Sequence, residues 1–147
     1  MKLTNIHFPS RNILLGLFGI IIISMFTACS NKINFLNSSV VPAARGTVNI
    51  TKDHNKNYVI KIDIYDLAEV ERLPAPNHTY VVWIETNEGL IKNIGQIKSS
   101  MEGLFSKNLK ASFESVTSFK PEKVFITSED NADIQFPSSQ IVLTTKY

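Results

Sequence analysis

Hydrophobic and polar residues alternate over much of the chain after Arg45, and this pattern predicts β-strands. The clearest case is residues 58–65, where one tyrosine and three isoleucines occupy every second position and polar Lys61 and Asp63 stand between them. Such alternation indicates a strand with one buried face. Residues 79–86 are apolar on both faces, which is typical of a central strand that is covered on both sides.

Shorter runs of the same kind predict strands at 46–51, 90–97, 109–116, 123–128 and 140–145. Turn residues separate the predicted strands. They comprise the cluster 53–57, the proline-containing stretch 67–77 and Asn87-Glu88-Gly89, where glycine takes the positive φ. Gly95 indicates a bulge, and residues 99–108 are compatible with a short helix or with a loop.

About seven strands with turns between them predict an all-β fold, namely a single antiparallel β-sandwich of immunoglobulin-like type over residues 45–147. A parallel sheet would need crossover helices, which the pattern does not show, and a small barrel is the alternative. We expect Trp83, the single tryptophan, to anchor the core between the two sheets. Stacking on a ligand is the alternative role for this side chain.

The N-terminus has a different pattern. Residues 13–26 are uncharged and apolar, a length that suits the core of a signal peptide and falls short of the roughly 20 residues of a membrane span. Thr27 and Ala28 then precede Cys29. These residues resemble the lipobox of bacterial lipoproteins, which implies a signal peptide over 1–28 and lipid on the Cys29 sulfur. The alternatives are a signal peptide cut elsewhere and an uncleaved anchor.

Lipidation of Cys29 predicts a protein held at a membrane. Several acyl chains give a stable anchor, whereas a single chain binds only marginally. The modification also uses the only cysteine, so it leaves no thiol for a disulfide or for catalysis. We therefore expect a cell-envelope protein that faces the periplasm or the exterior. Ser30, in place of an acidic residue, favours the outer membrane.

Residues 30–44 are rich in asparagine and serine and lack a sustained period, which predicts that 29–44 is a lipidated cysteine followed by a flexible tether. Fifteen residues span about 20 Å as a coil and about 50 Å when extended, so the domain would stand off the lipid surface. The alternative is that Ile33, Phe35 and Leu36 contact the membrane or the domain.

The charge balance argues against a nucleic-acid partner. The chain has 15 basic and 13 acidic residues, and Lys2 and Arg11 are lost with residues 1–28, which leaves 13 of each. Nucleic-acid-binding domains carry a basic face, so we expect no such partner. Lysines outnumber acids between Lys92 and Lys123. We interpret them as a solvated face, with contact to anionic lipid headgroups as the alternative.

Three stretches of the predicted domain form a further pattern, namely residues 80–85 (YVVWIE), 93–97 (NIGQI) and 124–129 (VFITSE), the last followed by Phe136-Pro137 and Ile141-Val142-Leu143. Together they resemble the extracytoplasmic C-terminal domain of anti-sigma-K (RskA-like) factors. The resemblance covers most of the chain after Arg45 and implies a β-sandwich of the outer, sensing half of that family. The chain shows nothing like the family's sigma-binding segment, so the resemblance does not imply anti-sigma activity.

Motifs that would indicate catalysis are scarce. The chain has no Gly-x-Ser-x-Gly, no His-Glu-x-x-His and no phosphate-binding loop. His54 and His78 fall in predicted loops, where we expect them to be solvated, with a shared metal site as the alternative. Glu129, Asn131 and Asp133 occupy alternate positions of another loop, so a calcium site is an alternative to a plain acidic loop.

We therefore predict a non-enzymatic, membrane-anchored extracytoplasmic lipoprotein without a cofactor. It would act as a binding or structural module of the envelope, with an envelope protein or component as its partner. The first alternative is an accessory of envelope-stress signalling. The second is an enzyme acting on envelope polymers, which predicts a pocket with convergent carboxylates or a histidine pair.

Overall fold

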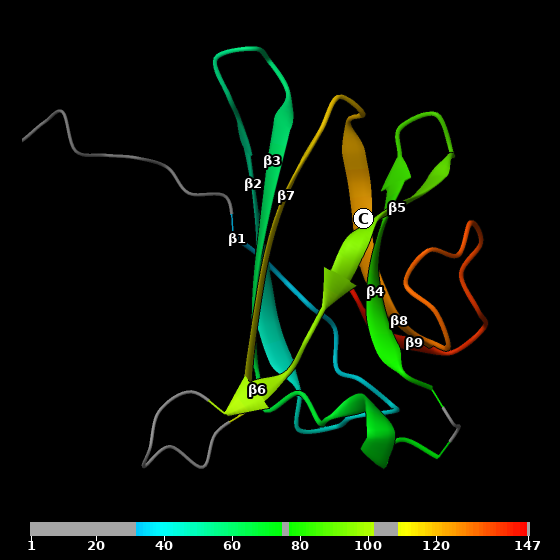
Figure 1. Ribbon diagram of the computed structural model, residues 1–147. Helices are drawn as coiled ribbons and strands as arrows, with labels where there is room; N and C mark the ends of the chain where they lie inside the picture. Colours follow the sequence, from blue (N-terminus) through cyan, green and yellow to red (C-terminus); the bar gives the residue numbers. More distant parts are fainter. Residues whose placement is uncertain (1–31, 75–76, 102–108, 147) are drawn as a thin grey trace, which may run out of the picture.

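The computed structural model describes residues 32–74, 77–101 and 109–146, which form an all-β fold (Figure 1). Its strands are β1 (Lys32–Asn34), β2 (Arg45–Lys52), β3 (Tyr58–Tyr65), β4 (Thr79–Thr86), β5 (Ile91–Ile97), β6 (Ser100–Met101), β7 (Leu109–Thr117), β8 (Pro121–Glu129) and β9 (Ile141–Thr144). A 3₁₀ turn, Val70–Arg72, lies between β3 and β4. The predicted signal peptide, residues 1–28, and Cys29 lie outside the described residues.

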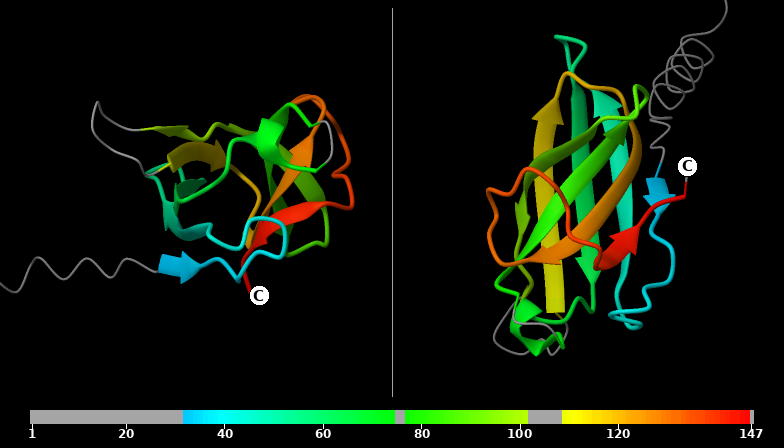
Figure 2. Two further views of the ribbon diagram at one scale, coloured as in Figure 1. Left: turned by 90° about the horizontal axis from the view of Figure 1, so that it is seen from below. Right: turned by 90° about the vertical axis from the view of Figure 1, so that its right-hand side faces the viewer.

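The strands form two sheets that pack face to face (Figures 1 and 2). The first has the order β1-β2-β3-β7-β6 and the second β5-β4-β8-β9, and every pairing is antiparallel. Strands β2, β3, β7 and β6 take the places of strands A, B, E and D of an immunoglobulin-type sandwich. Strands β5, β4, β8 and β9 take those of C′, C, F and G. The predicted antiparallel sandwich is confirmed.

All seven predicted strands are present. Those at 58–65 and 79–86 have the predicted bounds, and the others differ by at most two residues at either end. Gly89 has a φ of 75° in the β4–β5 turn, and Gly95, with a φ of 135°, lies at a shift of register between β5 and β4. The glycine turn and the bulge are therefore both confirmed.

The main core lies between the two sheets. Alternate residues of β3 and β4 form its centre, and each is at most 1% exposed: Ile60, Ile62, Ile64, Tyr80, Val82 and Ile84. Burying one large aliphatic side chain stabilises a fold by about 1.5–3 kcal/mol. The alternating apolar residues that predicted β3 are thus the residues that this strand buries in the core.

The prediction that Trp83 anchors the core between the sheets is wrong about the face. Side chains alternate along a strand, so Trp83 and Val81 point away from the other sheet. Trp83 is fully buried in a separate cluster with Val81 and Phe125, and Ile134 packs against that cluster. Its role is packing, as expected, but on the outer face of the second sheet.

The prediction of a flexible tether is wrong for residues 32–44. Strand β1 pairs with β2 at the edge of the first sheet, and the chain then crosses to the second sheet. The Phe35 N–H donates to the Gly46 carbonyl at 3.1 Å, and the Leu36 N–H donates to the Thr144 carbonyl at 2.8 Å. This segment closes one side of the sandwich between β2 and β9 (Figure 2).

The following residues of this N-terminal segment pack into the core between the two sheets. Val41 is 6% exposed and Ala44 is 4% exposed, and both pack with the side chains between the sheets. The Ser38 hydroxyl accepts hydrogen bonds from the N–H groups of Val40 at 3.2 Å and Val41 at 2.9 Å, which fixes the turn that delivers them. The folded domain therefore includes residues from Lys32 onward, instead of beginning at residue 45.

The short helix considered for residues 99–108 is not formed where the structure describes that stretch. Ser100 and Met101 form β6, which pairs with Lys110 and Leu109 of β7. Residues 102–108 lie outside the described residues.

Candidate functional site: a cleft beside strand β5

An open cleft of about 710 Å³ lies between the outer face of β5 and the loop formed by residues 130–140. Cavities that bind small ligands or peptide side chains commonly measure about 300–1,000 Å³, so the size is adequate for recognition. Strand β5 contributes Ile91, Lys92, Asn93, Gly95 and Gln96 to the lining, and the loop contributes residues 132–136. We refer to the loop as the 130–140 loop and to the hollow as the β5 cleft.

The Trp83 cluster supports the 130–140 loop from below. The Trp83 and Phe125 rings stack with centroids 6.3 Å apart and planes 12° from parallel. The Trp83 indole Nε1–H donates to the Thr127 hydroxyl at 2.8 Å, so its polar atom is satisfied inside the cluster. Ile134 of the loop packs on this platform. The buried aromatic pair therefore fixes the height of the loop above the sheet.

Asn93 ties the loop to β5. Its side-chain amide donates to two loop carbonyls, that of Ala132 at 2.8 Å and that of Ile134 at 3.0 Å. Its Oδ1 in turn accepts the Gly95 N–H at 3.0 Å, at the bulge of β5. One side chain thus uses both donor hydrogens and its oxygen to hold the two walls of the cleft at a fixed separation.

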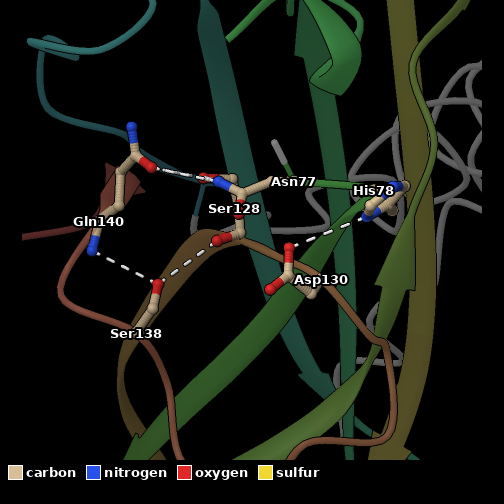
Figure 3. A network of polar contacts seen from close by, with 6 residues as sticks. All are labelled: Asn77, His78, Ser128, Asp130, Ser138 and Gln140. Atoms are coloured by element: carbon tan, nitrogen blue, oxygen red, sulfur yellow. Dashed lines mark hydrogen bonds and ion pairs between the residues drawn. The ribbon is translucent and has the colours of Figure 1, made fainter. Parts of the chain in front are cut away.

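A polar network holds the C-terminal part of the loop (Figure 3). The Asn77 amide donates to the Ser128 hydroxyl at 2.8 Å and to Gln140 Oε1 at 3.2 Å, and the Ser138 hydroxyl donates to the Ser128 carbonyl at 3.3 Å. The Glu129 carboxylate accepts the Ser138 N–H at 2.8 Å. These contacts join the loop to the ends of β8 and β9 and to the residues before β4.

The chemistry of the lining is apolar and amide-rich. Phe136 is 82% exposed at the rim, and the Gln96 and Gln135 side chains are also exposed. Among the described residues that line the cleft, Asp133 carries the carboxylate and Lys92 the ammonium group. Such a surface recognises a partner through contact with the aromatic ring and through hydrogen bonds to amides.

The three residues considered as calcium ligands do not converge. Glu129 is 5% exposed and its carboxylate holds the Ser138 N–H. The Asn131 Oδ1 accepts the Asp133 N–H at 3.1 Å, so it closes a local turn. In the described part of the chain, no group of three histidine, cysteine or acidic side chains is arranged to hold a metal ion.

His54 and His78, considered above as a shared metal site, lie at opposite ends of the sandwich, so the structure does not bring them together (Figure 1). His54 is exposed in the β2–β3 turn. His78 precedes β4, and its Nδ1 lies 3.8 Å from the Asp130 carboxylate with both side chains more than 70% exposed (Figure 3). An exposed pair of this kind contributes little to stability.

A second, smaller hollow of about 300 Å³ lies near the start of β4, with Glu69, Glu71 and His78 among its lining residues. Tyr80 also lines this hollow, and its hydroxyl donates to the Ala68 carbonyl at 2.9 Å. Burial, and then the charge of Glu71, raise the pKa of Tyr80 to about 12. The phenol is therefore a neutral donor at physiological pH, and its role is to fix the 66–73 segment.

Sequence reasoning missed the residues that form the cleft. Phe136 follows no strand pattern, and its one signal was the Phe136-Pro137 pair, a large aromatic residue in a polar loop. Asn93 lies within a strand whose sequence shows no functional motif, and its hydrogen-bond partners lie about 40 positions away along the chain. No local pattern connects them.

Comparisons with protein-family models, with curated proteins and with solved structures found no match. The resemblance to the anti-sigma-K sensing domain stays a prediction from the motifs. The described residues also contain no helix of the length and apolarity that crossing a membrane requires.

Proposed function

We propose that this protein is a lipid-anchored lipoprotein of the cell envelope, and that its sandwich binds an envelope protein in the β5 cleft without catalysing a reaction. The proposed lipid is carried by Cys29, and the proposed location is the outer membrane, with the domain facing the periplasm or the exterior. The lipobox-like residues before Cys29 support the anchor.

The observation that carries the binding role is the exposure of Phe136 beside a braced cleft. Phe136 is 82% exposed and Ile91, which lines the same cleft, is 45% exposed, so two large apolar side chains are open to a partner at one hollow. The Asn93 amide and the Trp83 cluster hold the loop that presents it. Aromatic anchors on rigid supports commonly dominate the energy of protein–protein interfaces.

A photoreactive amino acid at Gln135, in the lipidated protein in living cells, tests the binding role. We expect one discrete cross-linked species, which the additional substitution Phe136→Ala removes. The matched control places the probe at Lys61, on the exposed face of β3 in the other sheet. The same species from both positions, or a species that survives Phe136→Ala, would contradict binding in the cleft.

The role of an accessory in envelope-stress signalling rests on the resemblance of residues 80–85, 93–97 and 124–129 alone. It makes a separate prediction, namely that the species cross-linked at Gln135 contains a component of a sigma-factor regulatory complex. Identification of that species by mass spectrometry decides between this role and a general binding module.

A further inference from the structure

Strand β1 fixes the direction in which the chain enters the domain. Lys32 pairs with Asn49 and Asn34 pairs with Thr47. Followed from Asn34 back to Lys32, β1 therefore runs in the direction in which β2 runs toward Lys52. The β2–β3 turn lies at that end of the first sheet (Figure 1).

Three turns gather at this end of the sandwich: β2–β3 (residues 53–57), β4–β5 (87–90) and β7–β8 (118–120). The last two are joined, because the Asn87 N–H donates to the Lys120 carbonyl at 3.1 Å. We call this group of turns the hairpin end. The 3₁₀ turn Val70–Arg72 lies at the opposite end (Figure 1).

The chain between Cys29 and the domain is too short for a stand-off. From Asn49, opposite Lys32, β2 continues three residues to Lys52, which is about 10 Å. Cys29 is also three residues from Lys32, a reach of at most about 11 Å. Fully extended, the chain therefore brings Cys29 only to about the level of the β2–β3 turn.

We propose that the hairpin end rests on the lipid bilayer, with Phe119 and Leu90 in the headgroup region. The inference depends on the proposed lipid at Cys29. Acyl chains attached there must enter the bilayer, and the short connection brings the nearest surface of the domain into contact with the headgroups. That surface is the hairpin end, because β1 leads toward it.

The side chains at the hairpin end suit such a contact. Phe119 is 40% exposed in the β7–β8 turn, and Leu90 is 43% exposed where it closes the β4–β5 turn. The Lys92 Nζ lies 5.3 Å from the centroid of the Phe119 ring, so an apolar surface and a cation are neighbours. Apolar side chains flanked by lysines are the composition found where proteins lie at a membrane interface.

Charged side chains at the hairpin end make a secondary contribution to the proposed contact with the bilayer. Lys52, Lys56 and Lys120 are exposed there, but Glu88 and Glu122 are exposed as well. Attraction to anionic lipid is consequently partial, and salt screens it. Phe119 and Leu90 carry the specific contact, so they are the residues to change.

The test places a single labelling site in the full lipidated chain, reconstituted in vesicles of phosphatidylethanolamine and phosphatidylglycerol. Ser118→Cys, beside Phe119, carries an environment-sensitive fluorophore, and Glu71→Cys carries it at the opposite end. We expect a blue-shifted emission and a several-fold loss of quenching by an aqueous quencher at residue 118 alone. Leu90→Ser with Phe119→Ser should reduce both effects. The matched control is Tyr65→Ser, because Tyr65 is 49% exposed at the end of β3 away from the hairpin end, and it should leave both effects unchanged.

Flotation of the vesicles separates the two proposals. A chain that floats while its label at residue 118 responds no more than the label at residue 71 overturns the orientation and leaves the anchor standing. A chain that does not float refutes the anchor, and the orientation falls with it. The β-sheet circular dichroism of each variant shows that it is folded.

Discussion

The Trp83 indole donates a hydrogen bond to the Thr127 hydroxyl across two neighbouring strands, on the outer face of the second sheet. Both residues are fully buried although neither lies between the sheets. The sandwich thus has a third layer, the 130–140 loop, which packs on this pair and forms one wall of the β5 cleft.

Trp83→Phe should lower the free energy of unfolding, because it leaves the buried Thr127 hydroxyl without its donor. An unpaired buried group costs about 1–3 kcal/mol, and the smaller ring adds the cost of a cavity. Urea unfolding measures the change. The exposed-site control Phe136→Leu should stay within about 0.5 kcal/mol of the original protein. A Trp83→Phe variant as stable as that control would show that the third layer contributes nothing.

Asn93→Ala should release the 130–140 loop from β5, since the carbonyls of Ala132 and Ile134 lose their common donor. We expect faster amide hydrogen exchange in residues 131–136 and a global loss of about 1 kcal/mol. Gln96→Ala is the matched control, because Gln96 lines the same cleft without a bond to the loop in the described contacts. Equal exchange in both variants would contradict the brace.

The strands could be predicted from the sequence because apolar and polar residues alternate along β3 and its neighbours, and this alternation is visible within a few residues. The sequence could not predict which face of β4 meets the other sheet, because the residues around Trp83 are apolar on both faces. Residues 32–44 were misread for a related reason. They lack a period and become ordered through isolated contacts, such as those of Leu36 with Thr144 and of Val41 with the core.

A mature chain that begins at Arg45 should be much less stable than one that begins at Lys32. The shorter chain loses buried Val41 and Ala44 and leaves the edges of β2 and β9 open. Val41→Ala in the longer chain isolates part of the effect, at about 1–3 kcal/mol. Thermal unfolding compares the three proteins. Equal Tm values would restore the flexible-tether interpretation.

The raised pKa of Tyr80 predicts that the folded protein loses stability in strong alkali. Its pKa is about 12 in the folded protein against an ordinary 10.0, so the folded state holds the proton more tightly. The stability that the protonated Tyr80 phenol contributes to the folded state is fully present below pH 10, and it is lost as the pH rises from about 10 to about 12. Unfolding curves across this range should show a steeper decline for the original protein than for Tyr80→Phe. Parallel curves would contradict the assignment.

The intact mass of the protein taken from cell membranes tests the proposed anchor most directly. We expect a chain that begins at Cys29 and carries acyl chains on that residue, whereas the Cys29→Ala variant should keep the mass of the precursor. The contradicting result is a protein in the aqueous fraction whose mass corresponds to unmodified residues 1–147.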